Sequence, residues 1–327
     1  MTRKTLLTVA VIAALLGALT VGSADIGVRG VWATVFGSDP SPLARQIVFE
    51  WRLPRILFAA LGGAALALSG AVFQFITRNP LGSPDIIGFS SGAYAGALII
   101  AAMGVTGIWA RPVGALLGGA GAGILVYLLA WDRGLSGFRI IVVGIAVSVF
   151  LASVSTYLIL TLQREEAIVV AGWGLGSLAN VGWRQVGVLT LALVVALPAL
   201  AFLTPDMRLL DLGDDTAAGL GVRVNALRGW LMAVGVLLVA AVTAAAGPIA
   251  FIALAAPQIA KRLAGAPAIP LYMTAATGAL LLLLSDIVAR LLVPGGALPV
   301  GVVTLCVGGI YLLWLLSHAG LERRSYV

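Results

Sequence analysis

Residue types that could carry out chemistry are scarce in this chain of 327 residues. It contains one histidine, His318, and one cysteine, Cys306. A His-Glu-x-x-His pair and a glycine-rich loop ending in Gly-Lys-Ser/Thr are both absent, so the sequence contains no P-loop for ATP. Asp214-Asp215 lacks the further spaced acids of a metal–diphosphate site. The residues therefore predict no catalytic group, no metal site and no cofactor in this chain.

The remaining charged and polar residues inside apolar runs point to structure. Asp286 and Arg290 are four residues apart, so we expect them to pair along one helix. An ion-coupled carrier usually needs isolated acids deep in a span, and none is recognisable. Cys306 lies in an apolar run and is expected to be a small buried residue. The net charge of +7 is not gathered into a basic block interleaved with aromatics, so nucleic acid is not an expected partner.

The densest charge lies in residues 204–228 of a chain that is otherwise 61% hydrophobic and only 10% charged. A bilayer core does not accept that density cheaply, so this stretch is expected to lie in water. Leu209, Leu210 and Leu212 precede Gly213, and a second short helix is then predicted from Asp214 to Leu220, closed by Gly221. Two short helices joined by a glycine hinge would form a docking surface. An ordinary solvated loop is the alternative.

The elements around this stretch are apolar runs. A mean hydropathy of +1.10 excludes a soluble globular domain and predicts one all-α, polytopic membrane domain over residues 1–327. Ten spans are predicted at 6–24, 56–76, 92–109, 112–131, 140–162, 185–203, 226–246, 249–264, 271–292 and 298–317. The 249–264 run is short and carries Pro257, so it is expected to tilt or break. Residues 165–184 are predicted to form a short interfacial helix. The first run could instead be a signal peptide cleaved near Gly22-Ser23-Ala24.

Ten spans place both termini on one side of the membrane. If that side is the cytoplasm, 12 of the 20 lysines and arginines fall in inner segments and 8 in outer ones. This excess favours a cytoplasmic location for both termini. Residues 205–228 are then cytoplasmic, and residues 25–55 and 163–184 lie outside.

Five separated motifs accompany these runs. They are RLPR at 52–55; SG-x-x-x-Q followed by RNPL at 69–81; G-x-x-x-A-x-x-LG at 213–221; GPIAFIAL-x-x-P-x-x-x-x-R at 247–262; and LPVG at 298–301. In this order the motifs closely resemble the FecCD family over nearly the whole chain. Members of that family are ten-helix permeases of ABC importers for iron–siderophore complexes, haem and vitamin B12. Because the family keeps its first helix, residues 6–24 are retained as a span.

The resemblance implies roles for individual residues. Contact with the ATPase is implied for Leu210, Asp211, Leu212, Gly213, Asp214, Ala217, Leu220 and Gly221. Docking of the binding protein is implied for Arg52, Arg55 and Arg290, with interfacial anchoring and the Asp286 pair as the alternatives. A cytoplasmic constriction is implied for Asn79, Leu81, Gly137 and Phe138, although Pro80 alone could explain a helix stop at Asn79. Two positions depart from the family pattern: Gln258 replaces a usual histidine, and Gly137-Phe138 replaces a frequent polar pair.

The favoured function is a permease subunit in the bacterial cytoplasmic membrane that imports ferric siderophores and performs no chemistry itself. The implied partners are ABC ATPase subunits carrying ATP and Mg, a solute-binding protein, a second permease copy or paralogue, and membrane lipid. Haem or cobalamin is the alternative cargo. An ion-driven secondary transporter and an integral membrane enzyme are the alternative classes.

Overall fold

The computed structural model describes residues 2–22, 26–37, 41–105, 107, 109–132, 134–265, 269–293 and 298–324, with side chains omitted at 312 and 314–324. The cleavage site proposed at Ser23-Ala24 and the His318 side chain lie outside these descriptions. Within the described ranges the chain is helical and holds no strand; one isolated bridge joins Trp131 to Leu135. The all-α prediction is confirmed.

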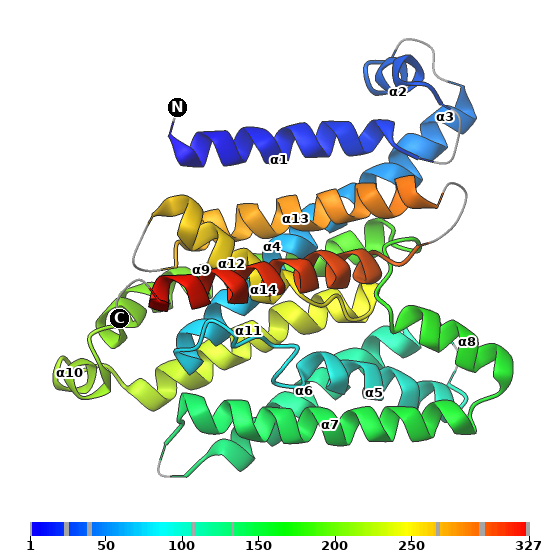
Figure 1. Ribbon diagram of the computed structural model, residues 1–327. Helices are drawn as coiled ribbons and strands as arrows, with labels where there is room; N and C mark the ends of the chain where they lie inside the picture. Colours follow the sequence, from blue (N-terminus) through cyan, green and yellow to red (C-terminus); the bar gives the residue numbers. More distant parts are fainter. Residues whose placement is uncertain are drawn as a thin grey trace.

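The helices follow one another along the chain in this order: α1 Arg3–Thr20, α2 Val28–Val35, α3 Pro42–Gln46, a π-helical turn η1 Ile47–Arg52, α4 Leu53–Thr77, α5 Phe89–Ala102, α6 Ala110–Ala130, α7 Gly137–Thr161, α8 Arg164–Trp173, α9 Trp183–Leu210, α10 Asp214–Gly219, α11 Val224–Ala246, α12 Ile252–Ala264, α13 Leu271–Leu292 and α14 Val300–Arg324. Figure 1 shows the long helices side by side, with α2, α3 and α8 at one end of the bundle and α10 at the other. The start of α1 and the end of α14 lie at the α10 end.

Helix α4 forms the centre of the bundle. Most of its residues are buried, and α13, α11, α12 and α9 all pack against it. Small residues allow this: a side chain on Gly63 would collide with the backbone of Gly278 on α13, and one on Gly70 would collide with the backbone of Ala253 on α12. Helices in lipid gain little from hydrophobic exclusion, so close backbone contact of this kind is what holds them together.

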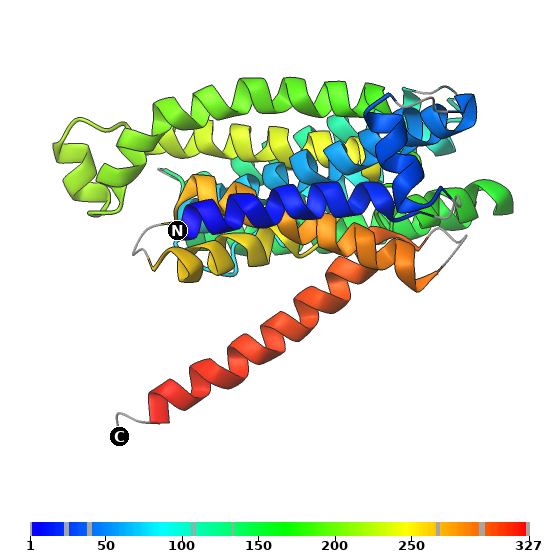
Figure 2. The same ribbon diagram turned by 90° about the horizontal axis from the view of Figure 1, so that it is seen from above.

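Helices α5 and α6 meet through what we call the glycine seam, formed by Gly92, Gly96, Gly114 and Gly118. A Cβ atom on Gly96 would meet the carbonyl of Gly114, and one on Gly118 would meet the carbonyl of Gly92. No side chain separates the two helices at these points. Helix α14 is attached more loosely, and Figure 2 shows it leaving the bundle at an angle.

Each of the ten predicted spans corresponds to a helix. By length and composition, seven helices in the described residues could cross a membrane: Arg3–Thr20, Pro42–Thr77, Ala110–Ala130, Gly137–Thr161, Trp183–Leu210, Val224–Ala246 and Leu271–Leu292. Two shorter apolar helices are Phe89–Ala102 and Val300–Tyr311. Helix α12 is only 13 residues long, as expected for the run carrying Pro257.

Some boundaries differ from prediction. Helix α5 ends at Ala102, seven residues before the end of its apolar run, because the chain turns at Gly104 with a φ of +66°. Helix α9 continues past its apolar run, through Pro205, to Leu210. The prediction that Cys306 is buried is wrong: its side chain is exposed on α14.

Candidate functional site

Residues 205–228 contain one short helix rather than two. The predicted helix after Gly213 is present as α10, and Gly213 and Gly221 flank it with φ values of +112° and +92°. The expectation of a separate helix before Gly213 is wrong, because residues 205–210 are the last turns of α9. The predicted cap also shifts by one residue: Gly213, and not the aspartate pair, occupies the N-cap position. Positive φ at these two turns is the reason that glycine is needed there.

The apolar residues of this segment divide into two groups. Leu210 and Ala217 are buried and fasten α10 to the bundle. Leu212 and Leu220, at either side of α10, are 63% and 58% exposed. Asp211 is exposed beside them. Large apolar side chains that stay exposed at the end of a bundle, outside its apolar helices, suit a surface that another protein covers.

Asp214, on α10, pairs with two arginines: Arg78 at the end of α4 and Arg228 on α11. Its Oδ1 atom accepts hydrogen bonds from Nη2 of Arg78 at 2.7 Å and from Nη2 of Arg228 at 3.0 Å, and its Oδ2 atom lies 2.9 Å from the same Arg228 nitrogen. Arg78 also donates to the carbonyl of Leu210 at 3.2 Å. Arg228 donates to the carbonyl of Leu135, in the α6–α7 connection, at 2.7 Å. The sequence patterns did not indicate this cluster.

The segment Arg78–Leu81 leaves α4 at the same end of the bundle. Arg78 closes α4 in the left-handed conformation, with φ 49° and ψ 33°. The side chain of Asn79 accepts a hydrogen bond from the backbone N–H of Leu81 at 2.9 Å, and Leu81 is 47% exposed. Asn79 borders a cavity of about 1000 Å³ between α4, α9 and α12.

The four predicted gate residues are only partly brought together. Gly137, at the start of α7, lies so close to the backbone of Thr77 that a Cβ atom would collide with it. Thr77 is the last residue of α4, so this contact brings the start of α7 close to the chain just before Asn79 and Leu81. Phe138, the next residue, is 77% exposed. The assignment of these residues to a constriction stays a prediction.

Gln74 and Gln258 pair across the inner part of this cavity. Nε2 of Gln258 donates to Oε1 of Gln74 at 2.6 Å, and Nε2 of Gln74 donates to the carbonyl of Leu254 at 2.9 Å. Gln74 is a buried polar side chain on the central helix and needs partners of this kind. The glutamine that replaces the usual histidine of the family pattern therefore has a definite structural use.

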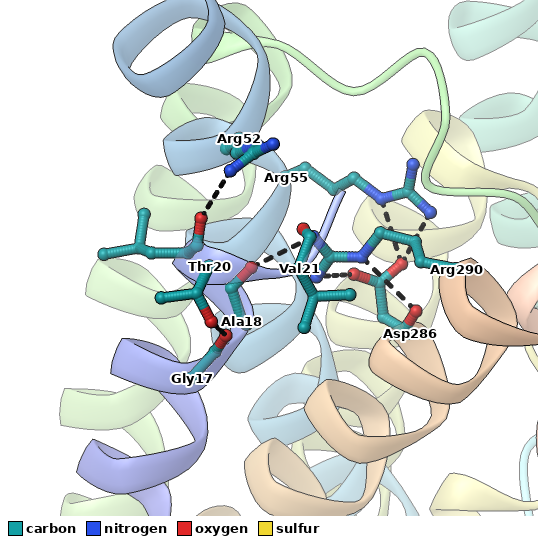
Figure 3. Close-up of polar contacts among 9 residues, drawn as sticks. Gly17, Ala18, Thr20, Val21, Arg52, Arg55, Asp286 and Arg290 are labelled. Atoms are coloured by element: carbon teal, nitrogen blue, oxygen red, sulfur yellow. Dashed lines mark hydrogen bonds and ion pairs between the residues drawn. The ribbon is translucent and has the colours of Figure 1, made fainter. Parts of the chain in front are cut away.

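At the opposite end of the bundle, Arg52, Arg55 and Arg290 gather around the end of α1 (Figure 3). Asp286 is fully buried and pairs with two of them: Nη2 of Arg55 is 2.7 Å from Oδ1, and Nη2 of Arg290 is 2.6 Å from Oδ2. The expected Asp286–Arg290 pair along α13 is confirmed. The additional partner from α4, Arg55, was not predicted.

Arg52 and Arg290 also donate hydrogen bonds to backbone carbonyl groups at the end of α1, which have no partner within the helix. Arg52 donates to Leu19 at 2.9 Å, and Arg290 donates to Ala18 at 3.2 Å and Val21 at 2.9 Å. The last carbonyls of any helix need such donors. Arg52 is only 5% exposed, so its side chain does not point outward beside Arg55. Docking of a binding protein here stays a prediction, and the Arg55 side chain, at 20% exposed, is the most accessible of the three.

The sequence patterns did not indicate that the carboxyl group of Asp85 is buried. Oδ2 of Asp85, in the α4–α5 connection, is buried, and Oδ1 accepts a hydrogen bond from Ser90 at 2.6 Å. Its position between Pro84 and a short apolar stretch suggested only a turn. No group of three or more histidine, cysteine, aspartate or glutamate side chains in the described part of the chain could hold a metal ion.

Comparison with known proteins shows to which family this chain belongs. The pattern of the FecCD transport family matches residues 7–318. The chain belongs to the FecCD family. Among relatives of this FecCD chain, the ferric enterobactin transport system permease protein FepG of Escherichia coli is 44% identical over 302 residues, which cover 92% of this chain and 91% of FepG. The achromobactin transport system permease protein CbrC of Dickeya dadantii is 36% identical, over 96% and 90% of the two chains.

A solved structure gives the same result for the fold. The FecCD chain resembles a metal-chelate type ABC transporter in an inward-facing conformation, with a TM-score of 0.82 and 28% identity over 96% of this chain and 98% of the other. The resemblance to the family that the five motifs indicated is therefore confirmed.

Proposed function

We propose that this FecCD chain is the permease subunit of an ATP-driven importer for ferric siderophores in the bacterial cytoplasmic membrane. The observation that carries the proposal is the whole-length similarity to permeases named for ferric enterobactin and achromobactin transport. The geometry supports it, because two exposed leucines, Leu212 and Leu220, flank α10 at one end of a bundle of apolar helices. The chain itself performs no chemistry in this proposal, and a separate ATPase with ATP and Mg drives transport.

The assembly contains further partners. Two permease chains, identical or paralogous, form the path through the membrane, surrounded by lipid. ATPase subunits cover α10, and a solute-binding protein delivers cargo at the opposite end, near Arg55. Hydrolysis then moves the bundle between inward and outward access by shifting the 205–228 segment.

Transport assays test the cargo. Deleting the gene should abolish uptake of radiolabelled ferric catecholate siderophore, and restoring this chain with its ATPase should recover it. Cobalamin and haem uptake should not change. A loss confined to cobalamin or haem would replace the siderophore with that cargo. Uptake that follows the proton gradient while ATP stays constant would contradict the ATP-driven class.

The arrangement in the membrane is part of the proposal: ten crossings, both termini and α10 in the cytoplasm, and α8 outside. Cysteine labelling tests it in a Cys306→Ser background, which removes the exposed natural thiol. An impermeant maleimide should label Glu166→Cys on α8 in intact cells, because that residue is exposed at the outer end. Asp215→Cys on α10 should be labelled only after the membrane is permeabilised. The reverse pattern would show that the orientation is inverted.

A further inference from the structure

The carboxylate of Asp214 is shared by two arginines that come from different helices and differ in solvent exposure. The Arg228 side chain is 8% exposed and is also held by the Leu135 carbonyl. The Arg78 side chain is 54% exposed and reaches Asp214 from the end of α4. One aspartate on α10 thus connects a buried arginine on α11 with an exposed arginine at the end of α4.

Arg78 is also the residue from which the predicted gate segment departs. Its backbone occupies the left-handed region, which an arginine adopts only when its surroundings hold it there. Its side chain contacts the carbonyl of Leu210 at the end of α9 as well as Asp214. The direction in which Asn79 and Leu81 leave α4 therefore depends on where Arg78 is held.

We propose that Asp214 is a positioning residue that ties the ATPase-docking helix α10 to the gate segment Asn79–Leu81 through Arg78. This inference rests on the proposed function and goes further by naming the connection between the two sites. When α10 shifts, the Asp214 carboxylate draws Arg78 with it, and the segment that follows Arg78 changes its exit from α4.

Solvent exposure determines when the connection is strong. In the isolated chain, water screens the Arg78–Asp214 pair, and a pair this exposed adds little to folding stability. An ATPase covering the neighbouring Leu212 and Leu220 would exclude water from the pair and strengthen the attraction. The Arg78–Asp214 pair is therefore expected to contribute little to folding of the permease. It is expected to matter in the assembled importer, where it transmits movement of α10 to the Asn79–Leu81 segment.

The test compares Asp214→Asn with the unchanged importer in proteoliposomes that contain the ATPase and the binding protein. In proteoliposomes matched for the amount of bound ATPase, we expect Asp214→Asn to lower siderophore import per ATP hydrolysed at least tenfold. The matched control is Asp132→Asn, which removes another exposed aspartate–arginine pair, Asp132–Arg139 at 3.0 Å, near the same end of the bundle. It should import at the normal rate.

A second variant breaks the same Arg78–Asp214 pair by changing the arginine. Arg78→Gly removes the side chain, and glycine adopts the left-handed backbone without strain, so α4 should end as before. We expect the same uncoupling, and the double variant should be no worse than either single one, because both changes break one connection. Additive losses in the double variant would contradict a shared path.

Other results overturn the inference. Normal import by Asp214→Asn would show that the pair transmits nothing, and loss of the ATPase from this variant would show that Asp214 only shapes the docking surface. Neither result contradicts docking of the ATPase on α10. If the docking role of α10 is wrong, Leu212→Asp will also retain the ATPase and import normally, which separates failure of the proposed function from failure of the tie.

Discussion

Leu212→Asp should release the ATPase from the permease and stop import while leaving the membrane bundle folded. Leu212 is 63% exposed in the chain by itself, so the change removes little packing within the permease. In the assembled importer the leucine is expected to be buried, which contributes about 2 kcal/mol. A carboxylate in the same apolar groove adds a desolvation cost of several kcal/mol. Together these effects predict binding weakened by at least about 100-fold.

Co-purification measures retention of the ATPase, and uptake of labelled siderophore measures import. Leu212→Met is the matched control, because it conserves apolar volume and should leave both readouts close to normal. Insertion and capture of the binding protein should be unchanged in Leu212→Asp. A variant that keeps its ATPase and imports at the usual rate would show that α10 is not the element that couples hydrolysis to transport.

Asp286→Ala should have the largest effect on the stability of the permease itself. Asp286 is fully buried, and Arg55 and Arg290 both pair with it. Removing the carboxylate leaves two guanidinium groups, at the start of α4 and the end of α13, without their counter-ion. Breaking a buried pair in this way typically costs about 3–5 kcal/mol. Arg290 would also lose the ion pair that helps to orient its guanidinium group toward the carbonyls of Ala18 and Val21.

The effect can be measured as a lower thermal unfolding temperature in detergent and as reduced accumulation in the membrane. Arg55→Leu should be milder, since Asp286 keeps Arg290 at 2.6 Å. Asp206→Ala, which removes an exposed acid near the opposite end of α9, is the control and should leave the unfolding temperature unchanged. If Asp286→Ala unfolded at the same temperature as the natural chain, the ion pairs of Asp286 with Arg55 and Arg290 would not stabilise the permease.

Local patterns in the sequence predicted the helices well and their ends less well. An apolar run long enough to span a membrane must be helical there, because lipid offers its backbone no hydrogen-bond partner. That argument applies only within the apolar run, whereas α9 continues beyond the run in helical form through Met207, Arg208 and Leu209 to Leu210. Turns at Gly213 and Gly221 were predictable because glycine alone accepts their backbone conformation easily.

The polar contacts divide according to distance along the chain. The Asp286–Arg290 pair follows from a spacing of four residues on one helix. Arg52 and its acceptor on Leu19 are 33 residues apart, and Arg78 and Asp214 are 136 residues apart. No local spacing predicts such partners, since they depend on how the helices pack. The sequence therefore named Asp214 as part of the docking segment without revealing that it also holds Arg78.

The glycine seam between α5 and α6 bears on how the importer can move. Side chains that interlock can exchange rotamers and let two helices slide, but along this seam the backbones of Gly92, Gly96, Gly114 and Gly118 approach without any side chain between them. Sliding would bring a larger neighbour to each crossing point and force the pair apart. During a transport cycle α5 and α6 should thus travel as one rigid body, and the hinges of the cycle must lie in the connections that enter and leave this pair.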